Sequence, residues 1–316
     1  MTIQELRERQ QWTLVQKIDH SLGVIDQFQS RLDGKVYVSF SGGKDSVVML
    51  SLVEVVIPQV KCVFVMTGCE SPSVCRFIRE QQQNHNIEIV RPVKTLQQVF
   101  AEYGFPLVSK EVARDIHFCR HNPYTQSARR KLWLGNPYHI PERWLYLLNE
   151  PYEVSDRCCY WLKKQPTLSY MKRTGRFPFV GILADEGYTR QTSYLRRGGC
   201  NTFKTSKDAH PTSWPIAIWT EQDIWQYING RHLQLPDIYF NGAKRTGCMG
   251  CAFGVYKDKE PFKAIKTLWP RWYNLVMGYE NNGVSYGEAI QRMIDKANHR
   301  IYNENHKDIQ VVKEEE

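Results

Sequence analysis

The hydrophobic positions near the start of the chain change their spacing from one segment to the next. From Leu14 to Leu32 they recur every three or four residues, which predicts a helix over residues 4–32. Residues 36–40 are rich in β-branched and aromatic side chains and follow the turn pair Asp33-Gly34, which predicts a first strand. The chain is therefore expected to begin with a helix that leads into a strand.

The same alternation continues further along the chain. It predicts a buried helix over residues 46–57, a second strand over 61–66, a polar helix over 73–84, a third strand over 87–90 and a fourth strand within 179–183. Strands and helices that alternate at this spacing indicate an α/β fold, with a parallel sheet covered on both faces. Ligands of such sheets bind beyond the carboxyl ends of the strands, which is where residues 41–46 lie.

Two regions depart from this pattern. Residues 120–155 combine clustered basic residues, aromatic residues and prolines, which indicates an insertion or a lid. From about residue 257 the sequence is helix-like, and it ends in the charged residues 313–316, which we expect to be a solvated tail.

Charge and apolar content narrow the class of protein. The chain has 316 residues, and its 42 basic and 33 acidic residues give a net charge of +9. This excess suits a polyanionic partner such as nucleic acid, a phosphate-rich small substrate, or a basic surface without a partner. No apolar run reaches the roughly 18 residues that cross a bilayer, and the charged N-terminus has no apolar signal segment. We therefore expect a cytoplasmic protein that does not enter a membrane.

The segment Ser41-Gly42-Gly43-Lys44-Asp45-Ser46 stands between a predicted strand and a predicted helix. Glycines let backbone N–H groups close on phosphate oxygens, and the helix N-terminus and Lys44 add positive charge. Asp45 could help to hold Mg²⁺, and both serines can donate hydroxyl hydrogen bonds. The segment lacks the Walker A pattern, because Val38 and Asp45 stand where that pattern needs glycine and Ser or Thr. The alternative is a plain glycine turn.

The cysteines suggest a metal centre. Nine cysteines in a chain without an export signal argue against structural disulfides. Cys158 and Cys159 are adjacent, and Cys248 and Cys251 form a Cys-x-x-Cys pair. Four thiolates suit Zn²⁺ or an iron–sulfur cluster, and the adjacent pair favours the cluster. Ordinary buried cysteines are the alternative. Four basic residues nearby in the sequence could offset thiolate charge: Arg157, Lys163, Lys164 and Arg245. Two further cysteines, Cys69 and Cys200, could carry sulfur.

Four stretches together resemble the phosphoadenosine-phosphosulfate reductase family of PP-loop proteins. They are the glycine segment 41–46, residues 66–72, residues 181–190, and residues 214–225 with the Trp-Thr-x-x-Asp-x-Trp pattern. The four cysteines resemble the signature of the [4Fe–4S] members. The resemblance implies a Rossmann-like parallel sheet of the adenine nucleotide alpha hydrolase-like type. It implies a nucleotide-binding PP-loop domain over residues 1–256 with a lid insertion at about 120–155, and a helical C-terminal extension and tail over 257–316.

The resemblance also implies roles for individual residues. Lys44 and Asp45 would be catalytic, with ATP and Mg²⁺ as cofactors, and Arg190 and Arg196 would hold a substrate anion. The cysteines Cys158, Cys159, Cys248 and Cys251 would hold a [4Fe–4S] cluster, with Zn²⁺ as the alternative. The nucleotide-binding set is Ser39, Ser41, Gly42, Gly43, Lys44, Asp45, Ser46, Thr67, Gly68 and Gly181.

The chain departs from the family pattern at two places. Met66 replaces the usual Asp or Asn, and no cysteine follows Cys251, although the sulfonucleotide reductases carry a nucleophilic cysteine in a C-terminal tail. The ATP pyrophosphatases of DNA phosphorothioation and some tRNA-thiolating relatives keep the loop and the cluster without that tail. The resemblance therefore implies an ATP pyrophosphatase that adenylylates a substrate, expected to be nucleic acid, for sulfur incorporation. The sulfur would come from a cysteine desulfurase or another donor.

Two other functions stay open at this stage. One is an adenylyl-sulfate or phosphoadenylyl-sulfate reductase that works with an unusual thiol, and the other is a non-catalytic nucleotide-binding protein. The sequence does not fix the oligomeric state.

Basic residues interleaved with aromatic ones give separate support for a nucleic-acid partner, because they can bind phosphates and stack bases. The alternative is a solvated lid with its own aromatic core. His117 and His121 lie one helical turn apart, which fits a metal site or ordinary structural histidines. The residues of the basic and aromatic segment are Lys110, Arg114, Arg120, Arg129, Arg130, Lys131, Trp133, Tyr138 and Trp144.

Overall fold

A computed structural model describes residues 2–133, 135, 137–204, 209–241, 243 and 246–311, with 299–311 described as backbone alone. Arg245 and the predicted tail at 313–316 lie outside the described residues. The chain forms two compact units, which are described separately. The first, the sheet unit, comprises Met1–Met66, Glu70–Arg91 and Pro166–Gly247. The second, the helical unit, comprises Thr67–Cys69, Pro92–Gln165 and Cys248–Glu316.

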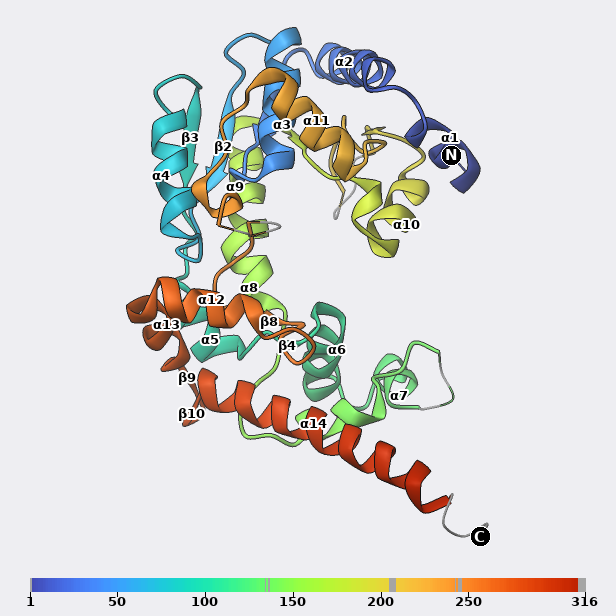
Figure 1. Cartoon of the computed structure of the whole chain (residues 1–316), viewed down its shortest axis with the longest axis vertical. Coiled ribbons are helices and arrows are strands. Elements are labelled where there is room, and N and C mark those ends of the chain that lie inside the picture. The colour runs from blue at the N-terminus through green and yellow to red at the C-terminus, as the bar shows by residue number, and fades with distance from the viewer. Residues whose placement is uncertain are drawn as a thin grey trace. The chain divides into compact units, whose positions relative to one another are not determined.

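The sheet unit confirms the predicted α/β fold. Its six-stranded sheet has the order β3-β2-β1-β5-β7-β6 and is parallel except for β6, which runs antiparallel to β7. Figure 1 shows the edge strand β3 beside β2. The four longer strands overlap the predicted runs, although β5 begins two residues before the predicted segment 179–183 and ends at Val180, and the two short strands were not predicted. The strands are β1 (Val36–Ser39), β2 (Cys62–Val65), β3 (Ile87–Val90), β5 (Phe177–Val180), β6 (Asn201–Thr202) and β7 (Thr212–Ser213).

Helices cover both faces of this sheet, because successive strand residues point to opposite sides. Val36 and Val38 of β1 pack with α2, α3 and α11 in the main core, whereas Tyr37 between them packs against Tyr170 of α9 on the other side. The helices of the unit are α1 (Ile3–Gln10), α2 (Leu14–Arg31), α3 (Lys44–Val56), α4 (Pro72–Gln81), α9 (Gln165–Thr174), α10 (Tyr188–Arg197) and α11 (Glu221–Arg231), with 3₁₀ turns at Ala184–Glu186 and Asp237–Tyr239.

The single helix predicted over residues 4–32 is wrong, because the structure has two helices there. α1 ends at Gln10 and α2 begins at Leu14. Thr13 caps α2 in a reciprocal arrangement, in which its hydroxyl accepts a hydrogen bond from the backbone N–H of Gln16 and the Gln16 side chain accepts one from the backbone N–H of Thr13. Such a capping box starts a new helix, and the apolar spacing alone does not reveal it.

The helical unit has its own core. The rings of Phe100, Phe105 and Tyr286 pack with centroids 4.7–5.4 Å apart. The core around them is built from the two long segments of the unit, 92–165 and 248–316. The helices are α5 (Leu96–Tyr103), α6 (Lys110–His121), α7 (Gln126–Leu132), α8 (Arg157–Cys159), α12 (Glu260–Leu268), α13 (Pro270–Met277) and α14 (Tyr286–Val311), with a 3₁₀ helix at Glu142–Leu148 and a π-helical turn at Tyr160–Lys164. The strand pairs are β4 (Leu107–Val108) with β8 (Ala252–Phe253), and β9 (Glu280–Asn281) with β10 (Val284–Ser285).

These units divide the chain differently from the expected domains. The segment expected to be a lid, 120–155, shares a core with residues 92–119 and with the C-terminal helices. The C-terminal segment is helical as predicted, with the β9–β10 hairpin in addition. The physical reason is that Trp144 and Leu147 of the lid segment are buried against the same core as Tyr286 of α14. Among the described residues, no helix has the length and apolar content needed to span a bilayer.

Candidate functional site

The glycine segment lies at the sheet reversal, which is the point where successive strands stop adding to one side of β1 and begin adding to its other side. From β1 the chain adds β2 and β3 on one side, and β5 then pairs with the other side of β1. In open α/β sheets the crevice at this reversal binds ligands at the carboxyl ends of the strands. Residues 41–43 leave the end of β1 and lead directly into α3, and Gly181 follows the end of β5. The two predicted nucleotide segments therefore meet at this position.

The loop is a closed turn that its serines hold from inside. The Ser46 hydroxyl donates to the Gly43 carbonyl at 2.8 Å and lies 3.1 Å from the Ser41 hydroxyl, while the Gly43 N–H donates to Ser41 Oγ at 3.3 Å. Gly42 has φ +71, a conformation that glycine adopts without strain. The serine hydroxyls therefore shape the loop as well as being available to a ligand.

Lys44 places a charged ammonium group at the first residue of α3. The side chain is buried, and its Nζ lies 3.1 Å from Asp45 Oδ1 and 3.6 Å from Glu221 Oε1. Burial lowers the pKa of Lys44, but the neighbouring carboxylates of Asp45 and Glu221 outweigh it and raise that pKa above its usual value. Burial also raises the pKa of Asp45, against the opposing effect of Lys44. The helix N-terminus and a positive side chain thus coincide, as an anion site requires.

Gly181 lets the end of β5 approach the start of α3. A Cβ atom at this position would lie 3.0 Å from the Asp45 carbonyl oxygen and 3.2 Å from the Ser46 nitrogen. Both are backbone atoms that cannot rotate away, so any larger residue would push the loop out of place.

Three residues near the loop were not predicted. The backbone N–H of Lys44 donates to the Tyr239 hydroxyl at 3.0 Å, and Glu221 reaches the Lys44 ammonium. A Cβ atom on Gly43 would lie 2.7 Å from Thr246 Oγ1, so this segment also lies against the loop. Tyr239 follows Lys44 by 195 residues, and no local pattern in the sequence links them. A phosphate that binds the Lys44 amide has to displace the Tyr239 hydroxyl.

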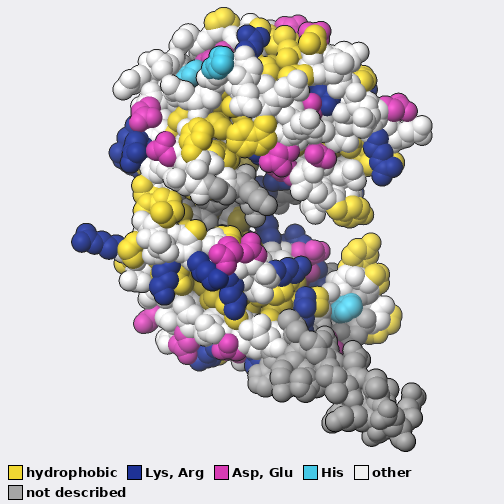
Figure 2. Space-filling view, viewed as in Figure 1, with side chains coloured by type: hydrophobic (Ala, Val, Ile, Leu, Met, Phe, Trp, Pro, Cys, Tyr) yellow, Lys and Arg dark blue, Asp and Glu magenta, His cyan; other side chains and the backbone are white. Residues whose placement is uncertain are grey.

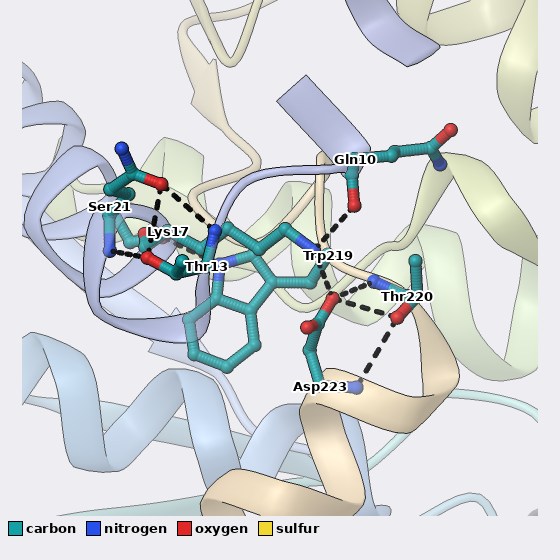
Figure 3. Close-up of polar contacts among 8 residues, drawn as sticks. Gln10, Thr13, Lys17, Ser21, Trp219, Thr220 and Asp223 are labelled. Carbon is teal, nitrogen blue, oxygen red and sulfur yellow. Dashed lines mark hydrogen bonds and ion pairs between the residues drawn. The ribbon is translucent and has the colours of Figure 1, made fainter. Parts of the chain in front are cut away.

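The Trp-Thr-x-x-Asp pattern of α11 anchors the N-terminal helices (Figure 3). Asp223 forms a buried ion pair with Lys17 of α2 at 2.6 Å and also accepts hydrogen bonds from the backbone and hydroxyl of Thr220. Trp219 donates its indole N–H to Ser21 at 3.0 Å. Because this network fixes the start of α11, it also fixes Glu221, which belongs to the same turn and contacts Lys44.

The remaining residues of the predicted nucleotide and anion sets lie in several places. Ser39 ends β1, between Val63 and Val180 of the neighbouring strands. Thr67 and Gly68 belong to the helical unit, where the Thr67 hydroxyl accepts a hydrogen bond from the Cys69 N–H at 3.1 Å. Their nucleotide role stays a prediction.

The arginines of α10 differ from one another. Arg190 is exposed and pairs with Glu186 at 3.2 Å, and Arg196 is exposed near the end of the helix. Arg197 instead stacks on Trp214 at 3.9 Å and donates to the carbonyl of Thr212, which makes it part of the fold. Arg190 and Arg196 are therefore the members of this group that an anion can reach.

The four cysteines of the predicted metal centre gather in the helical unit, although about ninety positions separate the two pairs in the sequence. Cys158 and Cys159 share a hydrogen bond between their sulfur atoms, which raises the pKa of Cys158 and lowers that of Cys159. Burial raises the pKa of Cys251 to about 11, and the thiols of Cys248 and Cys159 contribute in the same direction. The four thiols therefore lie near one another, and their role as ligands of one metal centre stays a prediction.

The surroundings of the Cys-x-x-Cys turn are rigid. Gly250 has φ +75, and a Cβ atom there would lie 3.0 Å from Trp272. The buried Tyr286 hydroxyl donates to the Gly250 carbonyl at 2.8 Å and accepts a hydrogen bond from the Ala252 N–H at 3.1 Å. Such neighbours orient metal ligands, and they come from α13 and α14.

Lysines compensate part of the thiolate charge. Lys110 and Lys163 both lower the pKa of Cys159, and Lys163 also lowers that of Cys251. Lys163 was predicted in this role and Lys110 was not. Cys69 is buried beside Cys158 and Cys248, whereas Cys200 is buried in the sheet unit, 3.5 Å from the Tyr194 hydroxyl.

Comparison with known proteins shows the family. The sequence profile of the phosphoadenosine phosphosulfate reductase domain matches residues 35–135 and 136–253, a span that holds both the glycine loop and the four cysteines. The chain belongs to this family. Two uncharacterized proteins of Methanocaldococcus jannaschii are 24% and 23% identical over 82% and 80% of this chain. The aligned regions are 45% and 50% of those relatives, so the chain spans about half of their length.

A phosphoadenylyl-sulfate reductase of Candida auris is among the solved structures found to be similar. The two chains share 13% identity, with a TM-score of 0.41 and coverage of 68% of this chain and 81% of that chain. At this score the likeness is no argument for a shared substrate.

In this member of the reductase family, the basic and aromatic segment is mixed in character. Trp144 is buried and packs on Tyr256 with ring centroids 4.9 Å apart, as a small aromatic core requires. Trp133 and Tyr138 are exposed, in the region where Figure 2 shows hydrophobic side chains over α7 and the loop after it. Lys131 pairs with the buried Asp115 at 2.7 Å, whereas Arg129 is exposed. Part of the segment is structural, and part is presented to solvent.

Proposed function

We propose that this member of the family is an ATP pyrophosphatase that adenylylates a nucleic-acid substrate for sulfur incorporation. The observation that carries the proposal is the closed glycine loop at the sheet reversal, with the buried ammonium group of Lys44 at the helix N-terminus. A charged donor fixed in a low-dielectric site stabilises negative charge that develops on phosphate oxygens during transfer.

The proposed reaction uses the loop to bind the pyrophosphate end of ATP. An oxygen of the acceptor attacks the α-phosphorus, the bond to the β-phosphate oxygen breaks, and pyrophosphate leaves with its charge against Lys44 and the loop amides. Asp45, next to Lys44 on the same turn, is the carboxylate available for Mg²⁺. A hydrosulfide nucleophile then displaces AMP from the activated position.

The donor set supports a thiolate-ligated metal centre. Four thiolates suit either zinc or a [4Fe–4S] cluster, and the adjacent pair Cys158 and Cys159 favours the cluster, because zinc sites usually use two spaced pairs. Bound there, the cluster would supply a thiolate-ligated metal centre for sulfur chemistry.

The exposed part of the basic and aromatic segment supports nucleic acid as the acceptor. Tyr124, Trp133 and Tyr138 are 88%, 66% and 78% exposed, which suits stacking on unpaired bases. Arg129 lies in the same segment, and the net charge of +9 favours a polyanion.

The test supplies the anaerobically reconstituted full chain with ATP, Mg²⁺, a cysteine desulfurase, ³⁵S-labelled cysteine and a thiol that reduces the desulfurase persulfide to hydrosulfide, together with RNA or DNA. We expect ³⁵S in one of the two nucleic acids and an equal amount of AMP, and neither product with Lys44→Ala. Sulfite formed from adenylyl-sulfate and thioredoxin would identify a reductase instead. Nucleotide binding without turnover in any combination would identify a non-catalytic protein.

A further inference from the structure

A second set of metal-ligating side chains lies in the helical unit and uses none of the cysteines. His117 and His121 project from α6 one turn apart, and Glu153 follows the 3₁₀ helix at Glu142–Leu148. The ligand atoms of the three residues all lie within 4.8 Å of one another. Histidines four residues apart on one helix face can bind the same ion.

The two inner atoms of this group face each other across a gap. His117 Nδ1 and Glu153 Oε2 are 3.8 Å apart, which is too far for a hydrogen bond. Both atoms are buried, and among the described residues neither has a hydrogen-bond partner. Two ligands of a tetrahedral zinc ion, with bonds near 2.1 Å, are about 3.4 Å apart. The gap therefore has nearly the size that an ion bridges, and an ion would satisfy both atoms.

The neighbours of the three side chains orient them as ligands. His121 Nδ1 lies 2.9 Å from the His117 carbonyl, which accepts its proton and leaves the Nε2 lone pair for a metal. Arg120 lies 3.3 Å from Glu153 Oε1 and donates to the Tyr152 carbonyl, so one carboxylate oxygen is held and the other is left for the ion.

The backbone around Glu153 is fixed on both sides. Its N–H donates to Asn281 Oδ1 at 2.7 Å, and its carbonyl accepts a hydrogen bond from the Phe105 N–H at 2.9 Å. The ligands therefore come from elements that the fold already holds in place.

We propose that His117, His121 and Glu153 bind one zinc ion. Two imidazoles and a carboxylate are a zinc ligand set that leaves a fourth position open, and the exposed side of His121 gives solvent access to it. This centre is independent of the cysteines and of the proposed function.

The test measures zinc binding to the full chain by calorimetry in a background with Cys158, Cys159, Cys248 and Cys251 all changed to serine, which removes the four predicted cysteine ligands. We expect one zinc ion per chain, and at least about 100-fold weaker binding in His121→Ala, since even the neighbours of ligands contribute 10- to 100-fold. His121 is exposed, so this variant keeps the core. Glu153→Gln is a second variant with nearly the same shape, and we expect weaker binding there too.

The control is His232→Asn, an exposed histidine at φ +53 in the sheet unit, where asparagine tolerates the same backbone. Its zinc affinity should equal that of the parent. Cobalt bound in place of zinc should show d–d bands without a sulfur charge-transfer band. Absence of zinc binding in the parent, or equal binding in the parent, His121→Ala and Glu153→Gln, would overturn the proposal.

Discussion

Gly181 shows how one missing side chain shapes the candidate nucleotide site. Its α-carbon stands so near the start of α3 that a Cβ atom would lie 3.0 Å from the Asp45 carbonyl oxygen. The residue does not need a left-handed backbone, so its role is close approach rather than conformational freedom. The family resemblance identified the position, but the sequence did not show which atoms it approaches.

We expect Gly181→Ala to lower kcat/KM for ATP about 10- to 100-fold, because small displacements of catalytic groups cost this much. Steady-state kinetics of AMP formation measure it. The matched control is Gly23→Ala in the exposed middle of α2, where an added Cβ meets nothing within 4 Å. That change should leave activity intact and raise stability by about 0.5–1 kcal/mol. Equal activity in both variants would show that the close approach does not matter.

Helices α2 and α11 are joined by a buried ion pair between Lys17 and Asp223 (Figure 3). Removing one charged side chain of a buried ion pair leaves the charge of the other side chain uncompensated. Because Asp223 retains its hydrogen bonds from Thr220, we expect Lys17→Met to lower the free energy of unfolding by about 3 kcal/mol, the lower end for such pairs. Urea denaturation measures this change.

The control for the ion pair is Arg76→Ala. Arg76 and Asp237 form an exposed pair at 3.4 Å, with two thirds of each side chain open to solvent. Exposed pairs contribute less than about 1 kcal/mol to stability, so the urea concentration at the midpoint of unfolding should be nearly the same for this variant as for the parent. A loss of equal size in both variants would contradict a special role for the buried pair.

Local signals predicted the longer elements, and contacts between distant segments escaped them. The runs of β1 and β3 carry enough β-branched residues to be recognised, whereas the two-residue strands β6 and β7 are too short to show a period. The glycine loop was recognised because its six residues are contiguous. Tyr239 was missed because its contact with Lys44 depends on the folded path of the chain.

At the scale of the molecule, the two candidate centres lie in different compact units. The loop and Lys44 belong to the sheet unit, and all four cysteines belong to the helical unit. The sequence did not predict this division, because the segments of each unit are interleaved along the chain. The shared core of residues 92–165 with the C-terminal helices arises from tertiary packing that no local pattern records.

This division predicts that the two centres can be removed separately. If the proposed cluster is present, Cys248→Ser should abolish its broad visible absorption while the chain keeps its affinity for a non-hydrolysable ATP analogue. Lys44→Ala should keep the absorption and lower the affinity for the ATP analogue at least about tenfold, as expected when a charge-assisted hydrogen bond is lost. Anaerobic absorption spectra and equilibrium binding measure both. Loss of both properties in each variant would mean that the units do not fold independently of these sites.

The bond that is cleaved in ATP distinguishes the proposed adenylylation from transfer of the γ-phosphate. The products of the full chain with ATP, Mg²⁺ and its acceptor are separated by chromatography, with Lys44→Ala as the comparison. We predict AMP and pyrophosphate in equal amounts, with a kcat about 10²- to 10³-fold lower in the variant. Formation of ADP and phosphate by the parent would contradict this prediction.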